Sequence, residues 1–205
     1  GSHYLPIQVE FRQMPKHLIL ASASPRRKTL LDQVYLKPEE VVAADVDETP
    51  KQGEVPRKLA IRLASEKSVK IAARFPNDFI LAADTVVACG RRILDKVESA
   101  NAAKEHLRLL SGRRHQVYGG VAVMTPGGIC HTRLVKTQVT FKRLSELEIE
   151  GYLASGEWKG KAGAYAIQGS AGAFVKRING SYSNVVGLPL YETLALLRGS
   201  GFTGA

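Results

Sequence analysis

The sequence predicts a mixed α/β fold, in which a central sheet is flanked by helices. Two continuous apolar runs, at residues 18–21 and 79–83, are typical of short strands that are buried on both faces. Two further segments, residues 115–124 and 134–141, alternate like paired antiparallel strands, and a Pro-Gly-Gly turn lies between them. Because helical and strand patterns alternate irregularly, they favour a mixed sheet over a regular doubly wound one.

The composition is that of a globular protein with an excess of positive charge. Of 205 residues, 44% are hydrophobic and 23% are charged, and the length fits one domain or two closely packed lobes. Lys and Arg number 29 against 19 Asp and Glu, so the formal net charge is +10. Such an excess favours anionic partners, which include nucleotides, nucleic acids and membrane surfaces. The charge is spread along the chain without the interleaved aromatic residues of strand-based nucleic-acid binders, so we expect a small charged ligand and no stable nucleic-acid partner.

Several features bear on organisation and location. Gly1-Ser2-His3 resembles an expression-tag remnant, which leaves residues 4–205 as one expected domain. Cys89 and Cys130 form neither a C-x-x-C motif nor a zinc spacing, so two buried reduced thiols are expected, with a disulfide left open. No run of about 18 apolar residues occurs, so we expect no membrane span. Without a signal peptide, the expected location is the cytoplasm.

The segment from residue 18 to residue 27 predicts an anion-binding turn. Ser24 stands where a helix N-cap belongs and Pro25 where the first helical residue belongs. Arg26 and Arg27 then fall in the first turn, where the helix dipole disfavours cations unless an anion is bound. Together with Ser22, these groups predict a phosphate cradle that is not a Walker A loop. An ordinary Ser-Pro-capped helix with solvated arginines is the alternative.

A helix of about five turns is predicted from Pro56 to Phe75. Its apolar stripe consists of Ala60, Leu63, Ala64 and Ile71, with Ile61 and Ala72 at the margin. Lys67 falls near the middle of this stripe, and a lysine that faces inward is uncommon unless it is paired or functional. A lysine that extends its amine to solvent is the alternative.

Acidic residues occur at two places that suit catalysis. Asp84-Thr85 follows the apolar run at residues 79–83, and ligands of α/β sheets collect outside the carboxyl ends of strands. Glu48 belongs to an acidic loop, and Lys96 follows a brief strand at residues 93–94. An acid in such a position suits a general base or a ligand of a hard cation, although Asp84 could instead cap a turn. The combined set suits attack of water on a phosphorus atom.

The remaining elements complete the predicted order. Glu98 to Leu110 is expected to be helical, and a capping box at Ser145–Glu148 is expected to start a helix that ends near Gly156. The other expected segments are a short strand at 41–44, a glycine-rich segment at 160–172, a strand at 174–178, a polar turn at 179–184 and a terminal helix at 188–197.

Seven motifs together resemble the Maf proteins, a family of nucleoside triphosphate pyrophosphatases. They are L-A-S-A-S-P-R-R, D-E-T-P, the Glu66-Lys67 pair, A-A-D-T-V-V, S-G-R-R-H-Q-V-Y, G-K-A-G-A-Y-A-I-Q-G and N-G-S-Y-S-N-V-V-G-L-P-L, spread from about Leu18 to Leu197. The resemblance implies an elongated α/β fold like that of inosine triphosphate pyrophosphatase, with two lobes around a cleft. It also implies hydrolysis of a nucleotide to monophosphate and pyrophosphate with Mg²⁺ or Mn²⁺.

The resemblance assigns roles to particular residues. It implies Asp84 as proton acceptor and Glu48 with Asp84 as metal ligands. The implied substrate-binding residues are Ser22, Ser24, Arg26, Arg27, Lys67, Thr85, Lys96 and Gln168. Val97 departs from the family, which usually carries Pro after the lysine that Lys96 matches.

Three of these positions indicate the substrate. Arg26, Thr85 and Gln168 look like the dTTP/UTP group of the family, whereas the 7-methyl-GTP group would show an aromatic residue, Gln and Glu. The alternatives are specificity of the 7-methyl-GTP type and a nucleotide- or nucleic-acid-binding regulator without turnover. A homodimer is compatible with the sequence.

Overall fold

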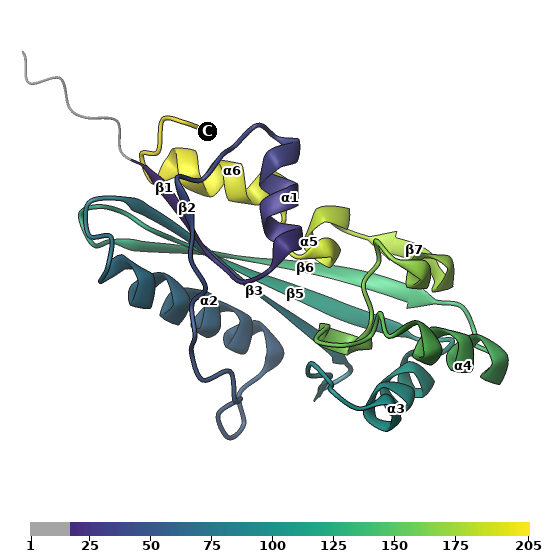
Figure 1. The fold of residues 1–205 in the computed structure, drawn as a ribbon. Helices are drawn as coiled ribbons and strands as arrows, with labels where there is room; N and C mark the ends of the chain where they lie inside the picture. Colours follow the sequence, from purple (N-terminus) through teal and green to yellow (C-terminus); the bar gives the residue numbers. More distant parts are fainter. Residues whose placement is uncertain (1–16) are drawn as a thin grey trace, which may run out of the picture.

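The computed structural model describes residues 17–205, and the tag-like residues 1–3 lie outside this part. Its centre is a seven-stranded mixed sheet with the order β2-β1-β3-β5-β6-β7, in which β4 pairs with β3 (Figure 1). The strands are β1 Leu18–Ala21, β2 Glu40–Val41, β3 Phe79–Cys89, β4 Arg92–Ile93, β5 Arg114–Met124, β6 Cys130–Phe141 and β7 Val175–Asn179. The helices are α1 Pro25–Gln33, α2 Pro56–Ala72, α3 Ala100–Leu110, α4 Glu146–Ser155, α5 Tyr182–Val186 and α6 Leu190–Gly199, with 3₁₀ turns at Ala162–Ala164 and Ser170–Phe174.

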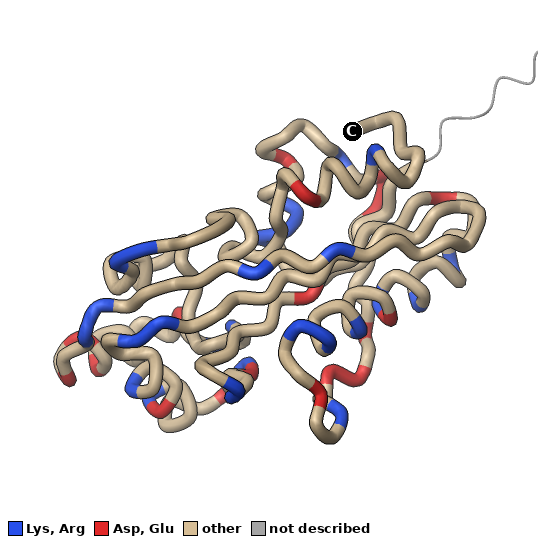
Figure 2. Tube along the Cα trace, turned by 180° about the vertical axis from the view of Figure 1, so that it is seen from behind, with Lys and Arg blue, Asp and Glu red and all other residues tan. Residues whose placement is uncertain are grey.

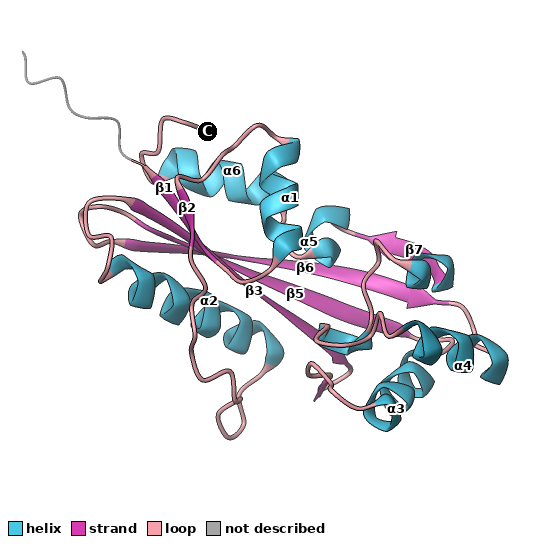
Figure 3. Cartoon of the chain, in the orientation of Figure 1, coloured by secondary structure: helices cyan, strands magenta, loops and turns pink. Residues whose placement is uncertain are grey.

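The predicted mixed α/β class is confirmed. Strands β2, β1 and β3 run parallel, whereas β3, β5, β6 and β7 pair antiparallel. Figure 3 shows helices on both faces of this sheet. All four residues of β1 are buried, as the continuous apolar run predicts.

Strand β3 is longer than predicted, and this changes the place of Asp84. The strand continues to Cys89 because residues after Asp84 keep their antiparallel pairing with β5, as in the pair Val86↔Tyr118. The expectation that Asp84 and Thr85 stand at the carboxyl end of a strand is therefore wrong. They lie in the middle of β3.

The sheet nevertheless has an opening beside these residues. Strand β1 ends where Ala21 pairs with Ala82, and β4 begins to pair only at Ala88. Between these points, residues 83–86 pair with β5 along one edge of β3. Along the other edge they pair with neither β1 nor β4. Ligands can therefore reach the middle of β3 from its edge.

Helix α2 packs on one face of the sheet, across β3, β5 and β6 (Figure 1). The predicted stripe of Ala60, Leu63, Ala64 and Ile71 is buried, which confirms the helical periodicity. The helix lies so close to β5 that a Cβ atom on Gly120 would come within 2.3 Å of the Ala60 carbonyl oxygen. Only glycine fits this contact.

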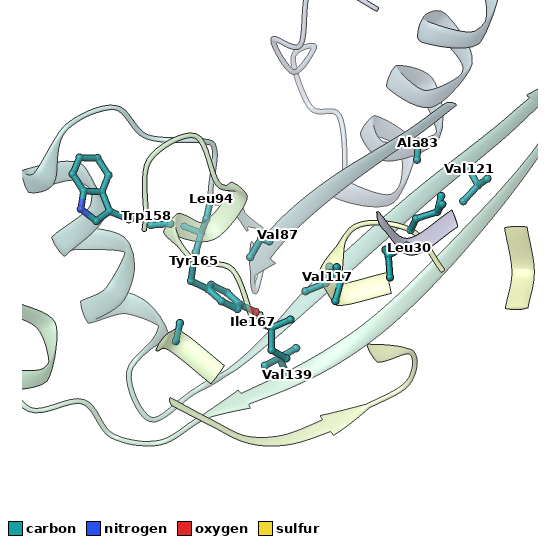
Figure 4. Packing of buried hydrophobic residues seen from close by; sticks show 14 of the residues in the cluster. Leu30, Ala83, Val87, Leu94, Val117, Val121, Val139, Trp158, Tyr165 and Ile167 are labelled. Carbon is teal, nitrogen blue, oxygen red and sulfur yellow. The ribbon is translucent and has the colours of Figure 1, made fainter. Parts of the chain in front are cut away.

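The other face carries the larger core, to which residues of α1, α3, α4, α5 and α6 contribute. Figure 4 shows its middle, where Val87, Val117 and Val139 from three strands lie near Tyr165 and Leu94. Burial of each large aliphatic side chain contributes about 1.5–3 kcal/mol to folding relative to exposure. This core fixes the glycine-rich segment, which includes Tyr165, against the sheet.

Some local predictions are confirmed and others are wrong. The Ser145–Glu148 capping box starts α4, and left-handed Gly156 ends it. The strand expected at 41–44 is only Glu40–Val41, and the polar turn expected at 179–184 instead contains the start of α5, which Ser181 caps. Both cysteines are free thiols, but Cys130 is exposed and Cys89 half-buried, because each lies at a strand end.

Candidate active site

A cavity of about 370 Å³ opens beside the gap along β3. Its lining includes almost all the predicted site residues: Ser22, Ser24, Arg26, Arg27, Glu48, Lys67, Asp84, Thr85 and Lys96. A hollow of about 340 Å³ adjoins it and shares Glu48, Asp84, Thr85 and Lys96, while Leu59, Leu63 and Ile93 give it apolar walls. The structure thus brings together predicted site residues that are up to 74 positions apart, since Ser22 and Lys96 line one cavity.

Gln168 is the predicted site residue that does not line the cavity. Its side chain is exposed, whereas Ala166, two residues earlier, belongs to the lining. The predicted contact between Gln168 and the substrate therefore stays a prediction.

The strand geometry of β3 explains how neighbouring residues serve two sides of the site. Successive side chains of a strand point to opposite faces of the sheet. Asp84 accordingly contacts Lys67 of α2, and Thr85 contacts Arg27 of α1 on the other face. The gap along β3 gives access to both.

The Arg27 guanidinium is held by three acceptors. Its Nε donates to the Gly187 carbonyl oxygen at 2.9 Å, Nη1 to Ser22 Oγ at 3.3 Å and Nη2 to Thr85 Oγ1 at 3.1 Å. Burial lowers the pKa of Arg27 from its ordinary value, and a guanidinium remains charged at neutral pH. No carboxylate forms an ion pair with Arg27 in residues 17–205, so its positive charge is available to an anion in the cavity.

Gly187 can hold Arg27 because α5 is fixed on the sheet. Buried Asn184 donates through Nδ2 to the carbonyl oxygens of Val117 and Val135 and to Thr137 Oγ1, at 3.1–3.2 Å. The backbone of Gly187 has φ = +146°, a conformation that L side chains rarely adopt. Asn184 and Gly187 therefore position Arg27 without lying beside the acidic residues.

The predicted turn after β1 forms, but its two serines do not have the roles that the sequence predicts. Ser24 occupies the N-cap position of α1, yet its hydroxyl makes no capping bond. Its backbone N–H instead donates to Ser22 Oγ at 3.1 Å. Ser22 is buried and organises the loop, while the Ser24 hydroxyl is left for a ligand. Arg26 is half-buried in the lining, where burial lowers its pKa.

Four charges of alternating sign line the opposite part of the cavity. Lys67 Nζ lies 2.9 Å from Asp84 Oδ1 and 3.1 Å from Glu48 Oε1, and Lys96 Nζ lies 3.6 Å from Glu48 Oε2. Lys67 is 6% exposed and Asp84 5%, which confirms that Lys67 faces inward. We call this set the charge chain; it consists of Lys96, Glu48, Lys67 and Asp84.

The charge chain compensates the cost of burying its acids. Burial raises the pKa of Glu48, but the charges of Lys67 and Lys96 outweigh this effect and hold the pKa below its ordinary value. Asp84 Oδ1 accepts from Lys67, and its second oxygen has no hydrogen-bond partner in the part of the chain that the structure describes. That oxygen is free to interact with water.

Lys161 is a site residue that the sequence analysis missed. It follows Gly160 in the glycine-rich segment and lines the cavity with Arg26. Burial, and then the positive charge of Arg26, lower the pKa of Lys161. The motif G-K-A-G contains this lysine, but the motif alone does not show that Arg26 lies near it in the folded chain. Two cations held together in this way favour an anionic ligand between them.

Tyr165 forms another missed part of the wall. Its hydroxyl lies 2.6 Å from Nε2 of buried His115, and its ring packs edge-on against His115 and Phe141. Gly163 makes this packing possible, because it has φ = +69° and a Cβ there would come within 2.8 Å of Val87. The glycine-rich segment therefore forms a rigid wall of the cavity.

Two carboxylates in the cavity are candidate ligands for a metal ion. Within residues 17–205, no group of three or more His, Cys, Asp or Glu side chains could hold a metal ion. Asp84 and Glu48 nevertheless converge on one ammonium group, which places two carboxylates close together. Mg²⁺ is commonly bound by one or two carboxylates together with substrate phosphates and water, so the residues fit such an ion.

Comparison with known proteins identifies the family. The family model described as Maf-like protein matches residues 17–200. The chain belongs to the Maf family. A relative from Caulobacter vibrioides, named dTTP/UTP pyrophosphatase, is 59% identical over 185 residues, which cover 90% of this chain and 96% of that protein. A relative of the same name from Mesorhizobium japonicum is 56% identical over 191 residues, covering 90% of this chain and 92% of its own.

Solved structures also resemble this Maf-like chain over part of its length. The Ham1 protein of Staphylococcus aureus matches with a TM-score of 0.43 and 19% identity, over 62% of this chain and 72% of that one. A HAM1 protein from Coxiella burnetii has the same TM-score with 15% identity, over 64% and 75% of the two chains. None of the helices in the described part of this chain is long and apolar enough to span a bilayer.

Proposed function

We propose that this Maf-like chain is a nucleoside triphosphate pyrophosphatase that hydrolyses dTTP and UTP to the monophosphate and pyrophosphate. The observation that carries the proposal is the pairing, within one cavity, of the charge chain with the arginine cradle formed by Arg26 and Arg27. The names of the relatives at 56–59% identity support the same substrates. The cavity of about 370 Å³ is also within the usual range for small-molecule sites.

In the proposed reaction, water attacks the α-phosphorus atom. A bond forms between the water oxygen and phosphorus, and the bond from phosphorus to the α–β bridging oxygen breaks, so that pyrophosphate leaves. The free carboxylate oxygen of Asp84 accepts the proton of the water. Lys67 orients this carboxylate through the bond to Oδ1 and balances its charge.

The cations hold the polyphosphate during this step. Arg27 presents a fixed guanidinium, and Arg26, Lys161 and Lys96 add positive charge around the cavity. Fixed donors of this kind stabilise charge that develops on phosphate oxygens in the transition state. The hydroxyl of Ser24 can donate a further hydrogen bond.

A divalent ion, Mg²⁺ or Mn²⁺, is part of the proposal. Glu48 and Asp84 would hold it together with the substrate phosphates. When bound, such an ion neutralises phosphate charge as a Lewis acid. Lys67 lies between these carboxylates, so it would share them with the ion.

The proposed specificity rests on Arg26, Thr85 and Gln168, which resemble the dTTP/UTP group. Thr85 lies on the cavity wall and is bound by Arg27, so a larger residue there would alter both the wall and the cradle. We further propose that residues 4–205 act as one domain of two lobes, and that the enzyme works in the cytoplasm.

The test is a panel of nucleotides that contains dTTP, UTP, CTP, GTP and 7-methyl-GTP, each with Mg²⁺, with Mn²⁺ and with a chelator. Pyrophosphate and orthophosphate are assayed separately. We expect pyrophosphate from dTTP and UTP, and loss of turnover with the chelator. Stepwise release of orthophosphate would indicate a phosphatase instead, and preference for 7-methyl-GTP would overturn the proposed specificity.

A further inference from the structure

A third hollow of about 520 Å³ lies on the sheet surface formed by β5, β6 and β7. It is lined by Arg114, Gln138, Thr140, Lys176, Arg177 and Asn179, and we call it the basic groove. It shares no lining residue with the cavity that contains Asp84. The basic groove is therefore separate from that cavity.

Strand register explains how the groove forms. Thr140 of β6 pairs with Arg114 on one side and with Arg177 on the other, and the neighbouring row pairs Gln138 with Asn179. Residues directly opposite each other on paired strands point to the same face. Since neighbouring strands lie about 4.8 Å apart, the two arginines emerge about 10 Å apart with a hydroxyl between them.

The charge of the groove is uncompensated. None of Arg114, Lys176 and Arg177 forms an ion pair or donates a side-chain hydrogen bond in the described part of the chain, and no acidic residue lines the groove. Two other lysines near this end of the molecule do have partners: Lys104 pairs with Glu150 and Lys142 with Glu148. Figure 2 shows Lys and Arg positions along the strands on this side of the molecule. Three like charges that share one hollow repel each other until an anion binds.

We propose that the basic groove is a second anion site, which takes a small phosphate-bearing ligand of nucleotide size. Guanidinium groups bind phosphate through two parallel hydrogen bonds, and a lysine adds a point charge. The Thr140 hydroxyl and the amides of Gln138 and Asn179 supply neutral donors and acceptors for the rest of the ligand. The volume favours a small ligand over an extended polymer. The proposal does not depend on the proposed function, because it concerns binding at other residues.

The test compares the wild-type protein with Arg114→Gln/Arg177→Gln. The probe is inorganic pyrophosphate, and binding is followed by calorimetry and by the backbone amide NMR signals of Thr140 and Asn179. We expect these two signals to shift on titration and the affinity at the groove to fall about tenfold or more in the variant, since each lost bond to a charged group is costly. The rate of dTTP hydrolysis should not change.

The matched control is Arg91→Gln/Arg133→Gln, which removes the same charge from two exposed positions outside all three hollows. It should bind pyrophosphate at the groove like the wild type. Equal weakening in both double variants would mean a general charge effect and overturn the site. Absence of shifts at Thr140 and Asn179 in the wild type would do the same.

Two further outcomes are decisive. If a single-stranded oligonucleotide shifts these signals and pyrophosphate does not, the ligand is a polymer and the proposal is wrong. If the double variant does not fold, Lys176→Gln is measured in its place, because Lys176 is exposed and makes no side-chain bond within residues 17–205. A protein that binds at the groove but hydrolyses nothing would refute the proposed function alone.

Discussion

Replacement of Lys67 by Met tests whether the charge chain is both a structural and a catalytic unit. The Lys67–Asp84 pair is almost fully buried, with 8% and 7% of the side chains exposed, so solvent screens it little. Removal of the ammonium leaves Asp84 as a buried carboxylate without an ion-pair partner. Breaking a buried pair in this way costs about 3–5 kcal/mol of unfolding free energy.

The reciprocal variant should cost less. In Asp84→Asn, Lys67 keeps Glu48 at 3.1 Å, and the Glu48 side chain is 42% exposed and thus well solvated. In the double variant Lys67→Met/Asp84→Asn, neither buried charge remains. We therefore expect the double variant to be more stable than Lys67→Met alone, yet to be as inactive as Asp84→Asn.

The measurement is urea unfolding at pH 7, followed by fluorescence of Trp158, together with the rate of pyrophosphate release. Lys58→Met is the matched control, since Lys58 is exposed on the same helix, and its stability should lie within about 0.5 kcal/mol of the wild type. The reasoning fails if Lys67→Met costs less than about 1 kcal/mol, or if the double variant is no more stable than Lys67→Met.

Four other predictions concern single residues. Asp84→Asn should lower kcat about 10²-fold or more as the proton acceptor is lost, and near-normal turnover would remove Asp84 from the mechanism. Lys161→Met should raise KM for dTTP about tenfold or more and change kcat less, because it removes a charged phosphate contact; an unchanged KM would exclude that contact. Burial lowers the pKa of His115 to about 4, so this residue binds protons more strongly in the unfolded chain than in the folded one. As pH falls from 6.5 to 4, the wild type should therefore lose up to about 3 kcal/mol of unfolding free energy from this residue. His115→Gln should reduce that loss in urea unfolding at several pH values, and identical pH profiles would contradict it. Gln168→Glu should lower kcat/KM for UTP relative to 7-methyl-GTP about 5- to 150-fold if its amide reads the base, and a constant ratio would show that exposed Gln168 does not.

The sequence predicted the parts of the site that depend on local pattern. Helical periodicity places Lys67 among buried alanines and leucines, and the structure buries it. Ser24 and Pro25 predict the start of α1, and the helix begins at Pro25 although the Ser24 hydroxyl makes no capping bond. Both signals lie within about one helix length, where periodicity and capping are informative.

Other parts depend on tertiary contacts that no local pattern contains. The pairing of β5 with residues beyond Asp84 lengthens β3, so the end of the strand could not be read from the apolar run alone. The bond from Arg27 to Gly187 joins residues 160 positions apart. Lys161 was missed because its role depends on the neighbouring charge of Arg26, which approaches it only in the folded chain.

The early end of β1 has a consequence for how this site can change. If β1 continued past Ala21 in its present register, Ser22 and Ala23 would pair with Ala83 and Asp84 and occupy the entrance to the cavity. The Ser-Pro turn ends the strand at Ala21. It thereby leaves a short length of the β3 edge without a neighbouring strand and open to a ligand. An exposed edge normally invites association with other chains, but here it is only a few residues long and bordered by charged side chains, which discourage such pairing. Substitutions along the border could alter substrate preference while the hydrogen-bonded sheet behind them stays intact.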